Sequence, residues 1–285
     1  MGASAARLWR CGSFALTLDR PLVMGIVNVT PDSFSDGGLH DDPLSALEHG
    51  RVLAAAGAGI LDIGGESTRP GSDPVSTEEE TARVVPVVGA LTHGLDTPLS
   101  VDTRRPEVAA ACVREGASII NDVSGFRDPA MMEVAAGCDA GLVVMHMLGE
   151  PRTMQDDPHY DDVVREVCDY LLRRANELER AGVVSERIAL DPGIGFGKTL
   201  AHNLEILRRL EEFVALGYPV VVGASRKRFI GEVTGEAEPA RRVAGSVAAA
   251  LWAASRGAHI LRVHDVAETV QALRVTGAIA REEPR

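Results

Sequence analysis

The sequence predicts a single α/β domain of the (β/α)₈ barrel class, and three observations lead to this prediction. Short apolar runs alternate with helical patterns, eight such runs occur, and each ends in polar residues. A strand buried on both faces of a parallel sheet is apolar almost throughout, so polar residues gather where it leaves the sheet. In a closed barrel, the carboxyl ends of the strands form the face that carries the functional groups. We therefore expect one polar site at the mouth of one barrel.

The expected elements follow one another in a strict strand–helix order. The strands are expected at 21–28, 60–68, 99–103, 119–123, 142–146, 188–191, 219–225 and 259–264. Apolar spacing and capping residues predict helices at 42–58, from 76 onward, and at 105–116, 128–136, 160–181, 200–216, 240–256 and 266–280. Ser76, followed three residues later by Glu79, is typical of a capping box at the start of the second helix.

The chain divides into a short extension and one domain. Residues 1–20 precede the first expected strand and form an N-terminal extension, and no linker or low-complexity tract divides residues 21–285. We therefore predict a single barrel domain over 21–285. A length of 285 residues is usual for one α/β barrel.

Composition narrows the classes of partner. The net charge is −12, which argues against nucleic acid or an anionic membrane as the main partner, because both require a broad basic surface. A small anion held by a few local cations is still compatible with this charge. No apolar run reaches the ~18 residues of a membrane span. Residues 1–19 lack the apolar core of a signal peptide, and the four cysteines lack metal-type spacing, so we expect reduced thiols and a cytoplasmic location.

The expected helix at 240–256 is unusual because it is apolar nearly all round. A helix on the outside of a barrel normally has a polar face. We expect its excess apolar face to pack against a second copy of the chain in a homodimer. The alternative is that a neighbouring loop or helix covers it.

Two long loops are expected at the mouth. The segment 28–38 is polar and contains Gly37 and Gly38, so it has the composition of a lid in which Phe34 covers a flat ligand. The alternative is a loop packed statically on the rim. The segment 64–71 follows Asp62 and offers hydroxyl, guanidinium and backbone N–H groups that suit an anion. Such loops are common, so this second signal is weak on its own.

Three polar side chains are expected deep in the mouth, at the ends of their strands. They are Asp102, Asn121 and Asp191. A buried carboxylate requires a partner, and Lys227 is one candidate. The other candidate is a ligand that presents an amidine-like pair of N–H groups, which a carboxylate accepts bidentately. Asn121 both donates and accepts, which suits the edge of a heteroaromatic ring.

The last two strands carry cations. Ser225 and Lys227 follow the seventh strand, and Arg262 and His264 share one face of the eighth. Loops at this position often bind phosphate in barrels. Arg226 and Arg228 are expected on the surface, and His146 is expected to be a rim residue rather than a base. The segment 193–199 resembles a nucleotide-binding loop, but its glycine spacing matches neither the phosphate-loop pattern nor the dinucleotide-binding pattern.

Five segments resemble one known family. Residues 24–38 (MGIVNVTPDSFSDGG) and 61–71 (LDIGGESTRPG) resemble the two signature segments of bacterial dihydropteroate synthase. Residues 191–198, 223–227 and 262–266 match further segments in the same order, and the likeness runs over about 21–275. The resemblance implies a transferase of folate biosynthesis. It would join (7,8-dihydropterin-6-yl)methyl diphosphate to 4-aminobenzoate, giving 7,8-dihydropteroate and diphosphate, with Mg²⁺ as cofactor.

The resemblance also implies roles for individual residues. The pterin and diphosphate would be bound by Thr68, Asp102, Asn121, Met145, Asp191, Lys227, Arg262 and His264. The 4-aminobenzoate would be bound by Phe34, Thr68, Arg69, Pro70, Phe196 and Ser225. Asn28 would lie near Mg²⁺. The residues expected to act in the reaction are Lys227, Arg262, His264 and a carboxylate of the first loop, Asp36 or Asp32.

Three other interpretations stay open from the sequence. A methyltetrahydrofolate-type pterin-binding methyltransferase domain would keep the polar set Asp102, Asn121 and Asp191 but would not need cations for diphosphate. A catalytically silent pterin-binding barrel would keep the fold without turnover. An unrelated phosphate-binding barrel enzyme would explain the last two strands but not the first signature segment.

Overall fold

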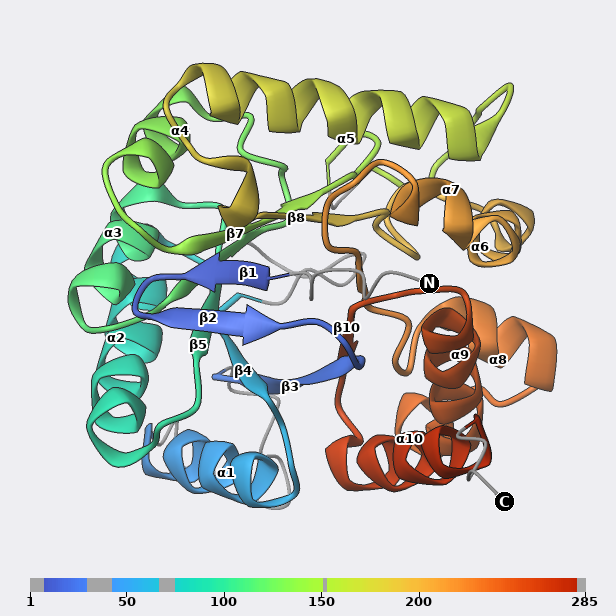
Figure 1. Ribbon diagram of the computed structural model, residues 1–285, viewed down its shortest axis with the longest axis horizontal. Helices are drawn as coiled ribbons and strands as arrows, with labels where there is room; N and C mark the ends of the chain where they lie inside the picture. The colour runs from blue at the N-terminus through green and yellow to red at the C-terminus, as the bar shows by residue number, and fades with distance from the viewer. Residues whose placement is uncertain (1–7, 30–42, 67–74, 151–152, 281–285) are drawn as a thin grey trace, which may run out of the picture.

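The computed structural model describes residues 8–29, 43–66, 75–150 and 153–280, and its parallel strands form a ring surrounded by helices (Figure 1). Within these residues the eight-stranded sheet has the order β8-β7-β6-β5-β4-β3-β10-β9, and a bridge between Leu190 and Val220 links β8 to β9. The strands are β3 (Leu22–Asn28), β4 (Ile60–Gly64), β5 (Leu99–Asp102), β6 (Ile119–Asp122), β7 (Gly141–Met145), β8 (Ile188–Asp191), β9 (Val221–Val222) and β10 (Ile260–Val263). The predicted (β/α)₈ barrel is confirmed.

Helices cover the outside of the ring, mostly one after each strand (Figure 1). They are α1 (Pro43–Ala55), α2 (Thr77–Gly94), α3 (Pro106–Arg114), α4 (Pro129–Ala136), α5 (Val163–Arg180), α6 (Leu200–Arg208), α7 (Leu210–Val214), α8 (Arg228–Thr234), α9 (Val243–Ser255) and α10 (Val266–Ala280), with 3₁₀ turns η2 (Ser185–Arg187) and η3 (Pro239–Arg241). None of the described helices is long and apolar enough to cross a membrane.

Some expected boundaries were wrong. The expected helix at 200–216 is interrupted at Arg209, whose backbone leaves the helical range (φ −104°, ψ 29°) while its guanidinium pairs with Asp162 at 3.0 Å. The helix α8 was not predicted. The expected strand at 219–225 is reduced to two residues, and the one expected at 60–68 ends at Gly64.

Local capping explains where α2 begins. The Ser76 side chain accepts a hydrogen bond from the Glu79 backbone N–H at 3.1 Å, as the sequence predicted. The Glu79 carboxylate does not complete the capping box, because it pairs with Arg83 one turn further along, at 2.5 Å.

A hairpin closes the amino-terminal end of the barrel. The strands β1 (Leu8–Cys11) and β2 (Phe14–Thr17) pair antiparallel within the predicted N-terminal extension, residues 1–20. Trp9 is fully buried, and its indole N–H donates to the Arg187 carbonyl at 2.9 Å. Around it lies a cluster of barrel-interior side chains, namely Met24, Ile60, Ile119, Val143, Ala189, Val221 and Ile260. With this end filled, a polar site has room only at the opposite, carboxyl end of the strands.

Candidate active site

One arginine joins two carboxylates at the mouth of the barrel. The Arg262 Nε atom, on β10, donates to Asp62 on β4 at 2.6 Å, and its Nη2 atom donates to Asp102 on β5 at 2.5 Å. Asn121, at the end of β6, donates to the same Asp62 carboxylate at 3.3 Å. Side chains from strands that are far apart in sequence therefore meet in one network, as the barrel topology requires. Asp62 was not assigned to the site from the sequence, because it lies within an apolar run.

A second pair lies beside this network. Asp191, at the end of β8, is buried and accepts a hydrogen bond from the Gly193 N–H at 2.7 Å. The Lys227 ammonium donates to the Ile194 carbonyl and lies 4.5 Å from the centre of the Phe196 ring. A Cβ atom added to Gly223 would lie 3.7 Å from the Arg262 Cβ and Cδ atoms and 3.9 Å from the Lys227 Nζ atom, so these two side chains are neighbours at the mouth.

The charges at the mouth are strongly perturbed by burial. Burial raises the pKa of the Asp102 and Asp191 carboxyl groups above their usual range, while Arg262 and Lys227 respectively act against that rise. Burial lowers the pKa of Lys227 to about 8, although Asp191 favours its protonated form. Asp62 and Asp102 share the Arg262 guanidinium, and Asp191 lies near Lys227. A ligand N–H group in this site would compete with these cations for the carboxylate oxygens.

The end of β10 meets the turn after β9. The Ser225 hydroxyl lies 3.0 Å from the His264 Nδ1 atom and accepts the His264 backbone N–H at 3.2 Å. Arg226 was expected on the surface, and its side chain is 31% exposed, but its guanidinium also makes two bonds to Asp265, at 3.2 and 2.5 Å, which was not expected. Arg226 holds a positive φ of 59°, so this ion pair helps to fix a turn that would otherwise be unfavourable. Arg228 is exposed, as expected.

An apolar wall lines one side of the mouth. It consists of Val123, Met145, Met147 and Met154, and Phe196 packs against it. Met145 and Phe196 were both expected at the site, and the structure brings them together. His146, next to Met145, is buried, and burial together with Lys198 lowers its pKa to about 2. The neutral imidazole already contacts Lys198 through Nδ1, which is consistent with the expectation that His146 is not a base.

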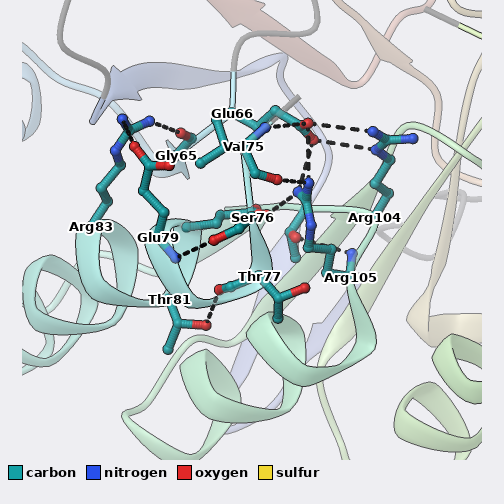
Figure 2. Close-up of polar contacts among 12 residues, drawn as sticks. Gly65, Glu66, Val75, Ser76, Thr77, Glu79, Thr81, Arg83, Arg104 and Arg105 are labelled. Carbon is teal, nitrogen blue, oxygen red and sulfur yellow. Dashed lines mark hydrogen bonds and ion pairs between the residues drawn. The ribbon is translucent and has the colours of Figure 1, made fainter. Parts of the chain in front are cut away.

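A second cluster of charges holds the two residues that flank segment 67–74 (Figure 2). The Glu66 carboxylate accepts from Arg104 at 3.2 Å, from Arg105 at 2.9 Å and from the Val75 N–H at 3.4 Å. Arg105 also donates to the Val75 carbonyl and to the buried Glu80 carboxylate. Burial alone would raise the pKa of Glu66, but the hydrogen bonds from both arginines lower it. This cluster was not predicted, because single Glu and Arg residues at loop ends carry no pattern.

Several expected residues lie outside the described part of the chain. These are Asp32, Phe34 and Asp36 in the first loop, and Thr68, Arg69 and Pro70 in the second. Asn28 is described, as the last residue of β3, where it pairs in register with Gly64. No group of three or more His, Cys, Asp or Glu side chains with the geometry of a metal site occurs among the described residues.

Comparison with known proteins agrees with this arrangement. Residues 24–264 match the model of the family described as pterin binding enzyme. Dihydropteroate synthase of Escherichia coli K12 is 49% identical over 273 residues, covering 95% of this chain and 96% of that protein. The solved structure of Xanthomonas albilineans dihydropteroate synthase with 4-aminobenzoic acid is 52% identical, has a TM-score of 0.93, and covers 98% of this chain and 100% of its own.

The chain belongs to the dihydropteroate synthase family. A further structure of the Xanthomonas albilineans family member, in complex with 7,8-dihydropteroate, is 50% identical with a TM-score of 0.89, covering 97% of this chain and 100% of its own. The family match over 24–264 includes the strands that carry Asp62, Asp102, Asn121, Asp191 and Arg262, and extends to His264 after β10. The resemblance noted from the signature segments is therefore confirmed.

Proposed function

We propose that this chain is a dihydropteroate synthase: it joins (7,8-dihydropterin-6-yl)methyl diphosphate to 4-aminobenzoate and releases 7,8-dihydropteroate and diphosphate. The observation that carries this proposal is the shared mouth, where carboxylates and cations are neighbours. The chain shares about half of its residues with family members over nearly its whole length, which supports the proposal. The two Xanthomonas structures that hold 4-aminobenzoic acid and 7,8-dihydropteroate support it as well.

The pterin edge suits the carboxylates. Its ring N–H and amino groups form an amidine-like pair, which a buried carboxylate accepts with two parallel hydrogen bonds. Asp191 retains free acceptor capacity beyond its bond to Gly193, and Asn121 can both donate and accept. Met145 and the Arg262 guanidinium offer one apolar and one planar cationic surface to the ring faces.

The cations suit the leaving group. In the proposed reaction the bond between the pterin methylene carbon and the diphosphate oxygen breaks, and the electron pair leaves with the diphosphate. The arylamine nitrogen then forms a bond to that carbon and loses one proton to water. Arg262, His264 and Lys227 would stabilise the departing negative charge, and preorganised donors of this kind are each worth about 3–4 kcal/mol. A carboxylate of the first loop, Asp36 or Asp32, would face the positive charge left on the pterin.

Mg²⁺ belongs to the proposal as a partner of the diphosphate. The Asn28 side chain supplies one carboxamide oxygen, an atom type that Mg²⁺ accepts. The diphosphate and water would supply further oxygen ligands. When bound, Mg²⁺ would neutralise diphosphate charge; Arg262 and His264 bind and orient that diphosphate from the protein side.

The assembly is proposed to be a homodimer formed through α9. Exposed side chains on this helix, Ala244, Ala248 and Trp252, recur every four residues and so form one stripe. Exposed Val233 on α8 and Val275 and Ile279 on α10 add apolar surface on the neighbouring helices. A second copy packing there would bury this surface. We also propose a cytoplasmic location, from the reduced cysteines and the nature of the pathway.

The three rival functions are disfavoured by particular features. The chain is about 50% identical in sequence to dihydropteroate synthases over nearly its whole length. A methyltransferase domain or an unrelated phosphate-binding barrel would not account for this identity. A catalytically silent barrel would have no need for Lys227, Arg262 and His264 together at one mouth.

The test is an assay with purified protein, the pterin diphosphate, 4-aminobenzoate and Mg²⁺. Diphosphate release that requires both organic substrates, with stoichiometric 7,8-dihydropteroate, is the expected result. Release without 4-aminobenzoate, or no release from folded protein that still binds pterin, would contradict the proposal.

A further inference from the structure

Lysine is nearly absent from this chain. Of its 29 lysine and arginine residues, only two are lysines, Lys198 and Lys227. Arginine supplies the positive charge everywhere else. The two side chains differ in shape, because a guanidinium is a planar fork and an ammonium is a compact point charge with three donors. Both lysines lie at the mouth of the barrel, and Lys198 is only 3% exposed.

The surroundings of Lys198 fit a compact amino group, and burial lowers its pKa well below the usual range. Its Nζ atom lies 2.9 Å from the His146 Nδ1 atom and donates to the Phe196 carbonyl at 3.0 Å and to the His146 carbonyl at 3.5 Å. In the described residues no carboxylate lies within ion-pair distance of it. Its three contacts come from two segments, the end of β7 and the loop between β8 and α6. Lys198 therefore ties these segments together.

The same loop is held from other sides as well. Lys227 donates to the Ile194 carbonyl and lies against the Phe196 ring. Gln155 donates to the Gly195 carbonyl at 2.7 Å, and the Tyr160 hydroxyl donates to the Gly197 carbonyl at 2.8 Å. Lys198 adds a hydrogen bond to the Phe196 carbonyl of this loop. Both lysines therefore contact Phe196 in the same loop: Lys198 binds its backbone carbonyl, and Lys227 lies against its ring.

We propose that Lys198 is a positioning residue of the active site, which holds the loop after β8 so that Phe196 and the Ile194 carbonyl meet Lys227. This inference rests on the proposed function for its kinetic consequence, since Phe196 would bind 4-aminobenzoate. Removing the amino group leaves the Phe196 and His146 carbonyl groups and one imidazole nitrogen without this hydrogen-bond partner, which favours a different loop conformation. An arginine at this position cannot make these three contacts from one nitrogen atom.

The kinetic test compares Lys198→Met with Arg208→Met, which removes an exposed basic side chain from the helix that follows the same loop. For Lys198→Met we expect a KM for 4-aminobenzoate raised about tenfold or more, with pterin affinity changed less than about threefold by calorimetry. Arg208→Met should match the wild type in both. A folded Lys198→Met variant with unchanged KM, or an equal loss for both ligands, would overturn the proposal.

A second variant tests the contact from the other side and leaves Lys198 in place. In His146→Asn the amide oxygen can accept from the Lys198 amino group, whereas in His146→Phe the side chain offers no acceptor and only the backbone carbonyl of residue 146 remains. We expect KM for 4-aminobenzoate to stay near the wild-type value in His146→Asn and to rise in His146→Phe. Equal values for these two variants would contradict the proposed contact, even if Lys198→Met fails to fold.

A spectroscopic test separates this inference from the proposed function. With lysine labelled by ¹⁵N, the side chains give two signals in the wild type and one, from Lys227, in Lys198→Met. We expect that remaining signal to move from its wild-type position, because Phe196 and Ile194 shift away from Lys227, and to stay unmoved in Arg208→Met. An unmoved signal in Lys198→Met overturns the proposal. If wild-type protein releases no diphosphate, the proposed function fails while this readout still decides the role of Lys198.

Discussion

Arg262 lies between two carboxylates at the mouth of the barrel, and this arrangement sets which of them stay available to a ligand. One guanidinium satisfies both Asp62 and Asp102, and Asn121 adds a hydrogen bond to Asp62. Asp62 thus orients two of the side chains proposed to contact pterin. Asp191 stands apart from this network, with Lys227 as its nearby cation. Its carboxylate is the one best placed to exchange its present partners for ligand N–H groups.

Asp191→Asn tests this assignment. The amide oxygen can still accept the Gly193 N–H, so the fold is expected to persist, but the bidentate acceptor for the pterin is lost. We expect pterin affinity to fall about 10- to 100-fold, the usual cost of losing a hydrogen bond to a charged group. Calorimetric titration measures this. Asp169→Asn, which changes an exposed carboxylate on α5, serves as the control and should bind pterin normally. Unchanged affinity in Asp191→Asn would remove this residue from the pocket.

The pH dependence of turnover tests Lys227. Burial lowers its pKa to about 8, so in the free protein its ammonium is present below that pH and is lost above it. Because the ammonium is the form proposed to act, kcat/KM for the pterin diphosphate should fall about tenfold per pH unit above about pH 8. Lys227→Ala is expected to abolish turnover. A profile flat to pH 10, or near-normal turnover in Lys227→Ala, would show that the ammonium is not required.

At the scale of elements, the hairpin is the least expected part of the fold. It fills the end of the barrel opposite the site, through Trp9 and Cys11. Trp9→Ala removes a fully buried ring and its hydrogen bond to Arg187, so we expect a loss of about 3–5 kcal/mol in the free energy of unfolding. Leu8→Ala on the same strand changes a side chain that is 48% exposed and should cost within about 0.5 kcal/mol. Equal effects of the two substitutions in urea titrations would show that the hairpin does not close the barrel.

The sequence predicted the strands better than the hairpin for a physical reason. Strands of the barrel are buried on both faces, so their apolar runs end visibly at Asp102, Asn121 and Asp191. The two hairpin strands have four residues each, and only Trp9 and Cys11 are buried, so their pattern is too short to recognise. Their burial depends on the barrel floor, which no local pattern describes.

The same reasoning separates the site residues that were predicted from those that were not. Arg262 and Lys227 were expected at the site because Arg262 lies on the eighth expected strand and Lys227 follows the seventh, where barrels often bind phosphate. Lys198 was not predicted as a site residue because it lies in a glycine-rich segment whose spacing does not match a nucleotide-binding loop. Its importance comes from contacts with His146, which is 52 residues away in sequence. The ion pair of Arg226 was not expected because its partner, Asp265, comes from another strand end.

At the scale of the whole molecule, the exposed stripe on α9 determines the proposed assembly. Trp252 is 40% exposed although its indole N–H already donates to the Leu207 carbonyl at 2.8 Å. Trp252→Glu places a charge in this stripe, so we expect the dimer to dissociate, as measured by sedimentation velocity. Val184→Glu adds the same charge at an exposed site before η2 and should leave the dimer intact. Wild-type protein that sediments as a 30.2 kDa monomer would contradict the dimer.

The barrel places the carboxyl ends of its strands at one face, so the proposed substrate recognition and the proposed departure of the leaving group share one space. The most direct test is a crystal structure of the chain with 7,8-dihydropteroate. We predict that the pterin N–H groups lie within hydrogen-bond distance of Asp191, that the Arg262 guanidinium covers the ring, and that the aminobenzoate ring lies beside Phe196. Product bound away from Asp191, or Asp191 and Arg262 facing separate cavities, would contradict this account.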